Sequence, residues 1–472
     1  MKSAAMAMPL SSETDKIALL ALKDKLTNGD PHALLSWNHS LNFCEWEGVK
    51  CSRRRMRVSA LQLQNQYWGG TLSPYLGNLT FLKEINLTNI HLHGEIPREV
   101  GHLKRLQILD LTQNNLRGQI PVEMINCSSL EVILLQYNNL TGKVPLWFGS
   151  IMQLTVLGIG ANSFVGSIPA SLGNLSSLEK LSLAENHLEG TITPALVAFP
   201  NLQKFGCGMN RFTGTFPSSI SNLSELQLFD IGTNDFHGPI SPTLGSLHKL
   251  YRFNIADNRF GSRRADDLDF LSSLQNCTQL QILDIDYNYL GGVLTEDLIG
   301  NLSSNLVMLF MGSNKISGRI PDGIGKLINL GALEMGNNSL EGTIPHAIGK
   351  LKNLVELDLG ANKLFDNIPL VIGNLTMLSF LDLSNNKFSG FIPFTLANCT
   401  MMESFIAHDN NLSGNIPVQT FGFQKGLIEL QLYSNSFTGS IPSDLSNLIH
   451  LSILYLHENM LTGEIPIVLA LP

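Results

Sequence analysis

The stretch "LVELDLGANKLFDNIP", from Leu354 to Pro369, contains the pattern on which the fold prediction rests. Leu357 and Leu359 alternate with polar or small residues, and this period of two predicts a short strand with one buried face. Asn362 follows where the chain would leave the strand, and its amide can pair with backbone groups that burial would otherwise leave unpaired. The stretch therefore predicts a strand, a turn closed by an asparagine and a return segment begun by proline.

This pattern recurs along the chain at a step of 24 residues almost everywhere, lengthened to 30 and then 26 between residues 258 and 314. The asparagine slot falls at residues 66, 90, 114, 138, 162, 186, 210, 234, 258, 288, 314, 338, 362, 386, 410, 435 and 459, and only Gln66 and Ile90 are not asparagine. One unit cannot bury its leucines alone, so neighbouring units must stack. The repeat therefore predicts an α/β solenoid with a parallel inner sheet.

Short segments such as "LEGTIP", "LSGNIP", "FTGSIP" and "LTGEIP" resemble the L-x-G-x-I-P mark of the plant-specific leucine-rich repeat. The segment "ETDKIALLALKDKLTNGDPHALLSWNHSLNFCEWEGVKCS" resembles the N-terminal cap of plant leucine-rich-repeat receptor kinases, so the resemblance covers about residues 13–472. The long repeat "NRFGSRRADDLDFLSSLQNCTQLQIL" resembles an insertion in the branch that contains immune receptors for bacterial peptides. The resemblance implies a right-handed curved superhelix of about 17 plant-type repeats with an N-terminal helical cap.

The expected organisation has three parts. Residues 1–12 would be the remnant of a leader, although "MKSAAMAMPLSSETDK" is too short to read as a convincing signal peptide. Residues 13–57 would be the cap and residues 58–472 the repeats, the last of them uncapped. No run of 18 apolar residues occurs, which predicts no membrane span. We expect an ectodomain truncated before the membrane span and kinase of its full-length relatives.

The cap has the features of an amphipathic helix followed by a short cross-linked loop. Ser12 with Asp15 three residues later predicts a helix N-cap. The expected apolar stripe consists of Ile17, Leu19, Leu20, Leu22 and Leu26. Trp37 and Trp46 are expected to cover the exposed end of the first strand, because the end of a solenoid must be capped.

The cysteines predict one cross-link. A disulfide between Cys44 and Cys51 would close a short loop and contribute roughly 2–3 kcal/mol. Metal binding is the alternative, but two isolated cysteines supply half a zinc site. The other cysteines are expected to be small buried hydrophobic residues: Cys127, Cys207, Cys277 and Cys399.

Composition and motifs argue against several function classes. A formal net charge of −8 gives no basic footprint for nucleic acid. The pairs Gly325–Lys326 and Gly349–Lys350 lack the upstream glycine and following hydroxyl of a phosphate loop. No HExxH, GxSxG or kinase signature occurs. We therefore predict no catalytic residue, no metal site, no cofactor and no enzymatic activity in this chain.

Glycosylation sequons predict the secretory pathway. Eight of them lie twelve or thirteen residues before the next asparagine slot, which places them on the outer segment of a repeat. These are Asn78, Asn126, Asn174, Asn222, Asn276, Asn301, Asn374 and Asn398. We expect an extracellular or cell-surface location, the plasma membrane for a full-length relative.

The exposed positions of the inner strands are the candidate ligand site, because they are rigid and repeated. The candidates combine aromatic residues with charges, as binding hot spots do: Tyr251, Arg252, Asp284, Asp286, Tyr287, Met308, Phe310, Glu334, Asp358 and Asp382. The acidic members would attract a basic ligand. A second cluster near the end contains Ile406, His408, Tyr433, Tyr455 and His457.

These features predict a ligand-recognition solenoid. The resemblance to receptor-like serine/threonine kinases implies a peptide, protein or microbial elicitor as ligand, a leucine-rich-repeat co-receptor kinase as further partner, and a role in plant defence or development. The alternative is a secreted inhibitor of cell-wall hydrolases that resembles the polygalacturonase-inhibiting proteins. Those proteins use the same repeat but are shorter and carry caps at both ends.

Overall fold

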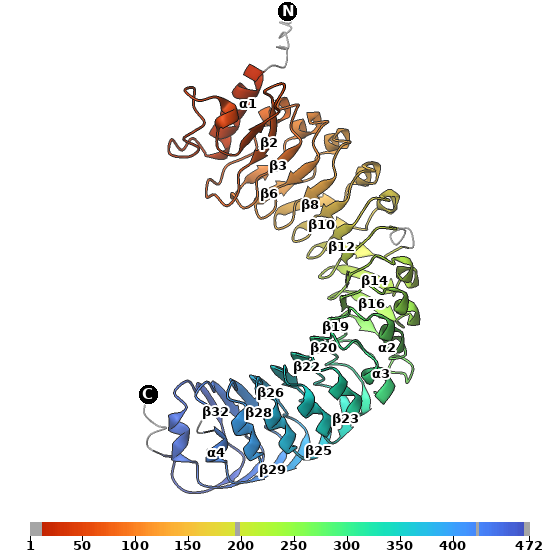
Figure 1. Ribbon diagram of the computed structural model, residues 1–472, viewed down its shortest axis with the longest axis vertical. Coiled ribbons are helices and arrows are strands. Elements are labelled where there is room, and N and C mark those ends of the chain that lie inside the picture. The colour runs from red at the N-terminus through yellow and green to blue at the C-terminus, as the bar shows by residue number, and fades with distance from the viewer. Residues whose placement is uncertain (1–11, 194–198, 422–423, 467–472) are drawn as a thin grey trace, which may run out of the picture. The chain divides into compact units, whose positions relative to one another are not determined.

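A computed structural model describes residues 12–193, 199–421 and 424–466, and the chain divides into two units, one up to Leu226 and one from Gln227 (Figure 1). The predicted leader, residues 1–12, falls outside the described residues except for Ser12. In both units short parallel strands form an inner sheet, and the return segments that the structure describes contain short helices. The predicted stack of strand-and-return repeats is confirmed within each unit.

The first unit contains a cap helix and eight inner strands. The inner strands are β1 (Val49–Cys51), β2 (Val58–Gln62), β3 (Glu84–Asn86), β5 (Ile108–Asp110), β7 (Val132–Leu134), β9 (Val156–Gly158), β11 (Lys180–Ser182) and β13 (Lys204–Gly206). A second set of strands consists of β4 (His93–Glu95), β6 (Asn115–Gly118), β8 (Asn139–Lys143), β10 (Ser163–Gly166), β12 (His187–Gly190) and β14 (Arg211–Thr215). The helices are α1 (Ser12–Leu26) and the 3-10 helices η1 (Phe43–Glu45), η2 (Pro74–Asn78), η3 (Arg98–His102), η4 (Val122–Asn126), η5 (Leu146–Ser150), η6 (Ala170–Asn174) and η8 (Ser218–Asn222).

The second unit repeats this arrangement. Its inner strands are β15 (Leu228–Asp230), β17 (Arg252–Asn254), β19 (Ile282–Asp284), β20 (Met308–Phe310), β22 (Ala332–Glu334), β24 (Glu356–Asp358), β26 (Phe380–Asp382), β28 (Ser404–Ile406), β30 (Glu429–Gln431) and β32 (Ile453–Tyr455). The second set is β16 (Asp235–Gly238), β18 (Arg259–Phe260), β21 (Ser317–Arg319), β23 (Ser339–Gly342), β25 (Lys363–Asn367), β27 (Lys387–Gly390), β29 (Asn411–Gly414), β31 (Ser436–Gly439) and β33 (Met460–Leu461). The helices are η9 (Pro242–Ser246), α2 (Phe270–Ser273), η10 (Leu274–Asn276), α3 (Glu296–Gly300), η11 (Asp322–Lys326), η12 (His346–Lys350), η13 (Leu370–Asn374), η14 (Phe394–Asn398), α4 (Val418–Phe421) and η15 (Ser443–Asn447).

The inner strands pair with equivalent residues in register, so leucines of successive repeats form one core. Leu333, Leu357 and Leu381 are aligned partners in β22, β24 and β26, and all three are fully buried. β1 runs antiparallel to its neighbour β2, because it belongs to the cap hairpin. The glycine–lysine pairs end η11 and η12, where Lys326 and Lys350 are exposed outer residues of two successive repeats.

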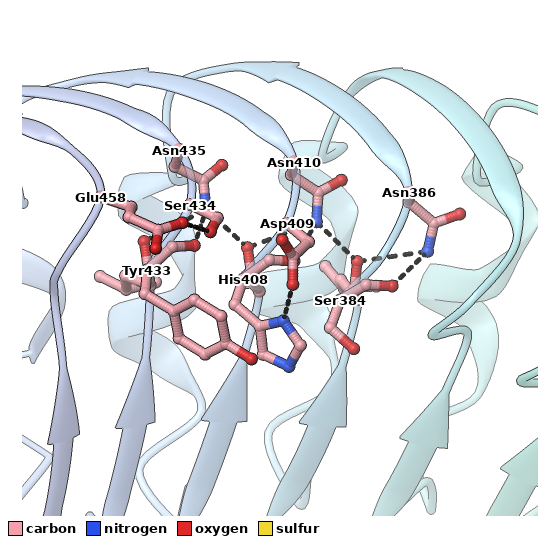
Figure 2. A network of polar contacts seen from close by, with 12 residues as sticks. Ser384, Asn386, His408, Asp409, Asn410, Tyr433, Ser434, Asn435 and Glu458 are labelled. Carbon is pink, nitrogen blue, oxygen red and sulfur yellow. Dashed lines mark hydrogen bonds and ion pairs between the residues drawn. The ribbon is translucent and has the colours of Figure 1, made fainter.

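The asparagine slot forms a ladder of side-chain hydrogen bonds in each unit. The Asn362 Nδ2 atom donates to the Met335 and Leu359 carbonyl oxygens, each at 3.1 Å, and its Oδ1 accepts from the Leu340 N–H at 2.9 Å. Figure 2 shows Asn386 and Asn410 at the same place in later repeats. The predicted role of the amide is therefore confirmed: it pairs backbone groups that the turn buries.

The cap helix α1 is anchored by a buried ion pair that the sequence did not reveal. The Asp15 carboxylate accepts from the Arg57 Nη2 at 2.7 Å and Nε at 2.8 Å, and also from the Val58 N–H at 2.9 Å. Asp15 is therefore engaged with β2 rather than with the start of its own helix. Ile17, predicted to be on the apolar stripe, is 47% exposed, because the buried face runs instead through Ala18.

The rest of the cap follows the prediction. Cys44 and Cys51 are joined by a disulfide, and Trp37 and Trp46 are buried and stacked with ring centroids 5.5 Å apart. The other four cysteines are buried free thiols: Cys127, Cys207, Cys277 and Cys399. Burial raises the pKa of the thiol to about 11 at Cys127, Cys277 and Cys399, which opposes formation of the nucleophilic thiolate.

The irregular repeat between Asn258 and Asn288 is closed by one buried carboxylate. Asp267 accepts from the backbone N–H groups of Ser262, Arg264 and Gly291, each at 2.9 Å. Burial alone would raise the Asp267 pKa, but these hydrogen bonds hold it below the ordinary value. The insertion is thus fixed to the following repeat rather than left as an unattached loop.

The predicted sequon asparagines are all exposed on the return side of their repeats. Seven are the last residues of 3-10 helices, and Asn301 directly follows α3. In the part of the chain that the structure describes, no helix combines the length and apolar character needed to cross a bilayer.

Candidate functional site

The exposed face of the inner strands in the second unit carries a row of aligned side chains. Strand pairing places Asp284 opposite Phe310, Phe310 opposite Glu334, Glu334 opposite Asp358 and Asp358 opposite Asp382. One acidic or aromatic residue therefore follows another at each step of the parallel sheet, about 4.8 Å apart. Five of the predicted candidates thus form one row.

Two hollows lie along this row and meet at Glu334 and Asp358. The first, which we call the strand hollow, has a volume of about 480 Å³ and is lined by Glu334, Glu356, Asp358, Ser379, Phe380, Glu403 and Ser404. The second, the turn hollow, has a volume of about 290 Å³ and is lined by Asp286, Tyr287, Gly312, Ser313, Glu334, Gly336, Asn337, Asp358, Gly360, Ala361, Asp382 and Ser384. A ligand in either hollow would therefore contact the same two carboxyl groups.

Glycines make room for carboxylates in the turn hollow. A Cβ atom at Gly336 would lie 2.6 Å from the Asp358 carboxylate oxygens, and one at Gly360 would lie 2.9 Å from an Asp382 oxygen. Any larger residue at these positions would displace the acidic side chains. The carboxylates instead accept backbone hydrogen bonds within their own turns, at 2.8 Å from Gly360 to Asp358 and from Ser384 to Asp382.

Four carboxyl groups in the row or next to it resist ionisation: Asp284, Asp286, Glu334 and Asp358. Burial, reinforced by the charges of Asp284, Glu334 and Asp358, raises the pKa of Asp286 to about 8. Burial also raises the pKa of Asp284 and of Asp358 to about 6, and the pKa of Glu334 above its ordinary value. A cation placed here would relieve the repulsion among these carboxyl groups.

The raised pKa values predict that the second unit loses stability as pH rises. Between about pH 4 and pH 8 the unfolded Asp286 would be ionised while the folded group holds its proton, so the folded state is favoured at the acidic end. We expect a lower unfolding temperature at pH 8 than at pH 5, with a smaller difference in Asp286→Asn, whose amide oxygen can still accept from the Gly312 N–H. The exposed Asp257→Asn should leave the difference unchanged; equal pH dependence in all three proteins would contradict this account.

The aromatic and apolar candidates are arranged beside the acidic row. Tyr287 is 63% exposed and has a positive φ of 48°, while Met308 is 37% exposed and Phe310 is half-buried. Tyr287 lines the turn hollow, but Tyr251, Met308 and Phe310 line neither of the two, although Phe310 is the strand neighbour of Glu334. Arg252 donates to Asp230 at 3.2 Å, so its charge is already balanced. Tyr251 and Arg252 are therefore peripheral to the two hollows.

The second predicted cluster is a stack of rings near the end of the described chain. Tyr433 lies between His408 and His457, with centroid distances of 4.2 and 4.6 Å, and Tyr455 meets the Tyr433 ring edge-on. Figure 2 shows His408 bonded through Nδ1 to Asp409, at 2.8 Å. The facing rings of His408, Tyr433 and His457 cover one another, while Tyr455 remains 48% exposed.

Three residues of the site were missed by sequence reasoning. Phe380 and Glu403 line the strand hollow, and Asp230 neutralises Arg252. Glu403 lies one residue before β28, and therefore outside the strand positions from which the candidates were predicted. The Asp230 contact could have been predicted, because β15 and β17 place Asp230 and Arg252 in neighbouring repeats on one face. Among the described residues, no group of three or more His, Cys, Asp or Glu side chains could hold a metal ion.

Family models match the N-terminal part of the chain continuously and three short segments of the remainder. A leucine-rich repeat N-terminal domain matches residues 12–52, and a leucine-rich repeat region matches residues 51–205. A leucine-rich repeat model matches residues 305–327, 377–399 and 426–448. The matches thus cover both the cap and the repeats.

Two curated relatives come from Arabidopsis thaliana. The LRR receptor-like serine/threonine-protein kinase EFR is 48% identical over 80 residues, which are 17% of this chain and 8% of the kinase. Polygalacturonase inhibitor 2 is 31% identical over 93 residues, which are 19% of this chain and 28% of the inhibitor. Each alignment thus covers a small part of the relative's length.

Two solved plant structures are similar over nearly the whole chain. The Arabidopsis receptor kinase HAESA ectodomain, in complex with an N-terminally extended IDA peptide hormone, is 30% identical with a TM-score of 0.78. That similarity covers 97% of this chain and 82% of the HAESA chain. The plant peptide hormone receptor RGFR1, in complex with RGF2, is 32% identical with a TM-score of 0.79 over 90% of this chain and 66% of that chain.

Proposed function

Because the chain belongs to the leucine-rich-repeat family represented by the ectodomains of plant receptor kinases, we propose that its second unit is an extracellular recognition surface for a basic peptide or protein ligand. The single observation that carries this proposal is the meeting of two hollows at Glu334 and Asp358. The ligand would place a lysine or arginine side chain against these carboxyl groups and an apolar residue against the neighbouring aromatics.

The chemistry of the hollows favours a cation over a neutral group. Burial and mutual repulsion hold protons on Asp286 and Asp358 at acidic pH, and a bound cation would stabilise their ionised forms. Tyr287 and Phe310 supply rigid aromatic surface, which contributes strongly when an interface excludes water. Peptide hormones occupy the two similar ectodomains, which supports a peptide as the ligand class here.

The remaining parts of the proposal follow the family. The predicted extracellular or cell-surface location is the one that such ectodomains have, and the exposed sequon asparagines are compatible with it. We include in the proposal a leucine-rich-repeat co-receptor kinase as second partner, a role in plant defence or development, and the absence of catalytic activity. The matched families are a repeat and an N-terminal domain, which support binding rather than catalysis.

The test uses a lysine- and arginine-containing synthetic peptide library, from which the tightest-binding member becomes the probe. We expect the double variant Tyr287→Ala with Phe310→Ala to weaken binding of this probe by roughly 2 kcal/mol, or about 30-fold. The reason is that removal of both rings removes contact area from which water is excluded. The matched control is Leu134→Ala with Tyr137→Ala, which changes the equivalent slots of β7 in the first unit. Equal affinity of the two double variants, measured by calorimetry, would remove the assignment.

The inhibitor function remains the alternative, supported by the match to polygalacturonase inhibitor 2. That match covers 19% of this chain, whereas the similarity to the HAESA ectodomain covers 97%. An inhibition assay with a purified polygalacturonase separates the two. The receptor proposal predicts no inhibition by this chain, and stoichiometric inhibition would favour the alternative.

A further inference from the structure

In the first unit, three guanidinium groups surround one aromatic ring. The Cζ atoms of Arg105, Arg57 and Arg55 lie 4.3, 4.6 and 5.4 Å from the centroid of the Phe81 ring. These are cation–π distances, at which the negative face of the ring attracts a guanidinium group. Asp15 balances the Arg57 charge, so Arg55 and Arg105 are the members of this cluster available to an external ligand.

The repeat itself brings these residues together. Arg57, Phe81 and Arg105 are spaced by 24 residues, and each precedes by three residues the aligned strand positions Ala60, Glu84 and Ile108. Phe81 therefore belongs to the repeat between the two arginines. Arg55 comes from the loop that connects β1 to β2. The cluster thus lies in the turns and the loop that immediately precede the inner strands β2, β3 and β5.

Further cations surround the cluster without a partner of opposite charge. In the described part of the chain, six exposed side chains make no ion pair and donate no hydrogen bond: Arg53, Arg54, Arg55, Lys83, Lys104 and Arg105. Residues 51–107 contain eight lysines and arginines against three glutamates and no aspartate, although the whole chain has a formal net charge of −8. Positive charge is therefore concentrated in this segment, although the chain as a whole is negatively charged.

Gathering like charges costs free energy that the folded chain alone does not recover. Stacking on a ring uses the flat face of a guanidinium and leaves its edge N–H donors free, and these donors match planar oxyanions such as carboxylates. Because the ring restrains Arg55 and Arg105 before any ligand arrives, less side-chain entropy is lost on binding. The surface, which we call the arginine edge, is therefore organised for anions.

We propose that the arginine edge binds an acidic polysaccharide of the polyuronate class, through carboxylates repeated along the sugar chain. The cations are spread over three successive repeats and a loop rather than gathered in a pocket, which suits a long ligand with regularly repeated charges. The choice of a polysaccharide rests on the extracellular location in the proposed function. Peptide recognition by the second unit does not depend on it.

The test measures binding of de-esterified oligogalacturonate to the full chain by calorimetry at several salt concentrations. We expect measurable affinity that falls as salt rises, and at least about 10-fold weaker binding for Arg55→Gln with Arg105→Gln. Phe81→Leu keeps every charge but removes the ring, and should weaken binding by about 2- to 5-fold. Arg98→Gln is the matched control, because Arg98 is exposed in the same unit but already paired with Glu99.

Several results would overturn the proposal. One is that fully methyl-esterified oligomers bind as tightly as de-esterified oligogalacturonate. Others are that Arg98→Gln weakens binding as much as the double variant, or that the double variant does not weaken it. The last is that anionic lipid vesicles or RNA bind more tightly than oligogalacturonate. The double variant changes exposed side chains, and its unfolding temperature should match that of the unchanged protein. The basic peptide probe should bind the double variant normally, so failure of the arginine edge and failure of peptide recognition are distinguished by separate measurements.

Discussion

Asp15→Ala is expected to destabilise the first unit by about 3–5 kcal/mol, because the Arg57 guanidinium would remain buried without its counter-charge. The Val58 N–H would lose its acceptor as well. The measurement is native-state hydrogen exchange of peptides from α1 and β2, which reports local opening free energies even when the whole chain does not unfold in one step.

Two controls distinguish the effect of breaking the buried ion pair from the effect of removing any charged side chain. Glu99→Ala removes the partner of Arg98 in an exposed pair and should cost less than about 1 kcal/mol. Asp15→Leu combined with Arg57→Met removes both charges and should recover most of the loss, since no isolated charge is left behind. A cost below about 1 kcal/mol for Asp15→Ala alone would show that the pair does not anchor the cap.

Asn314→Ala is expected to destabilise the second unit by about 3 kcal/mol or more. Its Nδ2 atom donates to the Ile285 and Gly312 carbonyl oxygens, each at 2.9 Å, and its Oδ1 accepts from the Leu290 N–H at 3.1 Å. Asn314 is fully buried, so the Leu290 N–H would be left unpaired, at about 1–3 kcal/mol. The Ile285 and Gly312 carbonyl oxygens would each lose one of two donors, because the Asn288 side chain and the Tyr287 N–H still pair with them. Hydrogen exchange of peptides from β19 to β22 measures the loss.

The control is Asn337→Ala in the next repeat. Asn337 is exposed, and its amide donates only to the Ser313 hydroxyl, at 3.2 Å. We expect an effect within about 0.5 kcal/mol. Similar losses at both positions would mean that the buried ladder contributes nothing beyond an ordinary surface asparagine.

Much of the fold could be predicted because each repeat has the same neighbours at the same offset. The period of two around Leu357, the asparagine slot and the spacing of 24 together specify which residues pair across the inner sheet. The same reasoning placed Glu334 beside Asp358, since aligned slots must be adjacent in a parallel stack. The repeat therefore determines the row of exposed side chains as well as the core.

What could not be predicted lies where the repeat gives no information. The cap helix occurs once, so neither the rotation that exposes Ile17 nor the Asp15–Arg57 contact follows from a period. The depth of the hollows depends on Gly336 and Gly360, whose missing side chains admit neighbouring carboxylates. The buried contact and the hollows depend on the direction in which side chains point, whereas a sequence pattern specifies only the position of a residue in its repeat.

The position of the bound ligand is measured most directly by photo-cross-linking of the selected basic peptide, followed by mass spectrometry. The account predicts cross-links in the inner strands β19 to β26 and the turns that follow them, with Tyr287 and Phe310 among the modified residues. It also predicts loss of these cross-links in Glu334→Gln with Asp358→Asn. Cross-links confined to the return helices, or to the first unit, would contradict it.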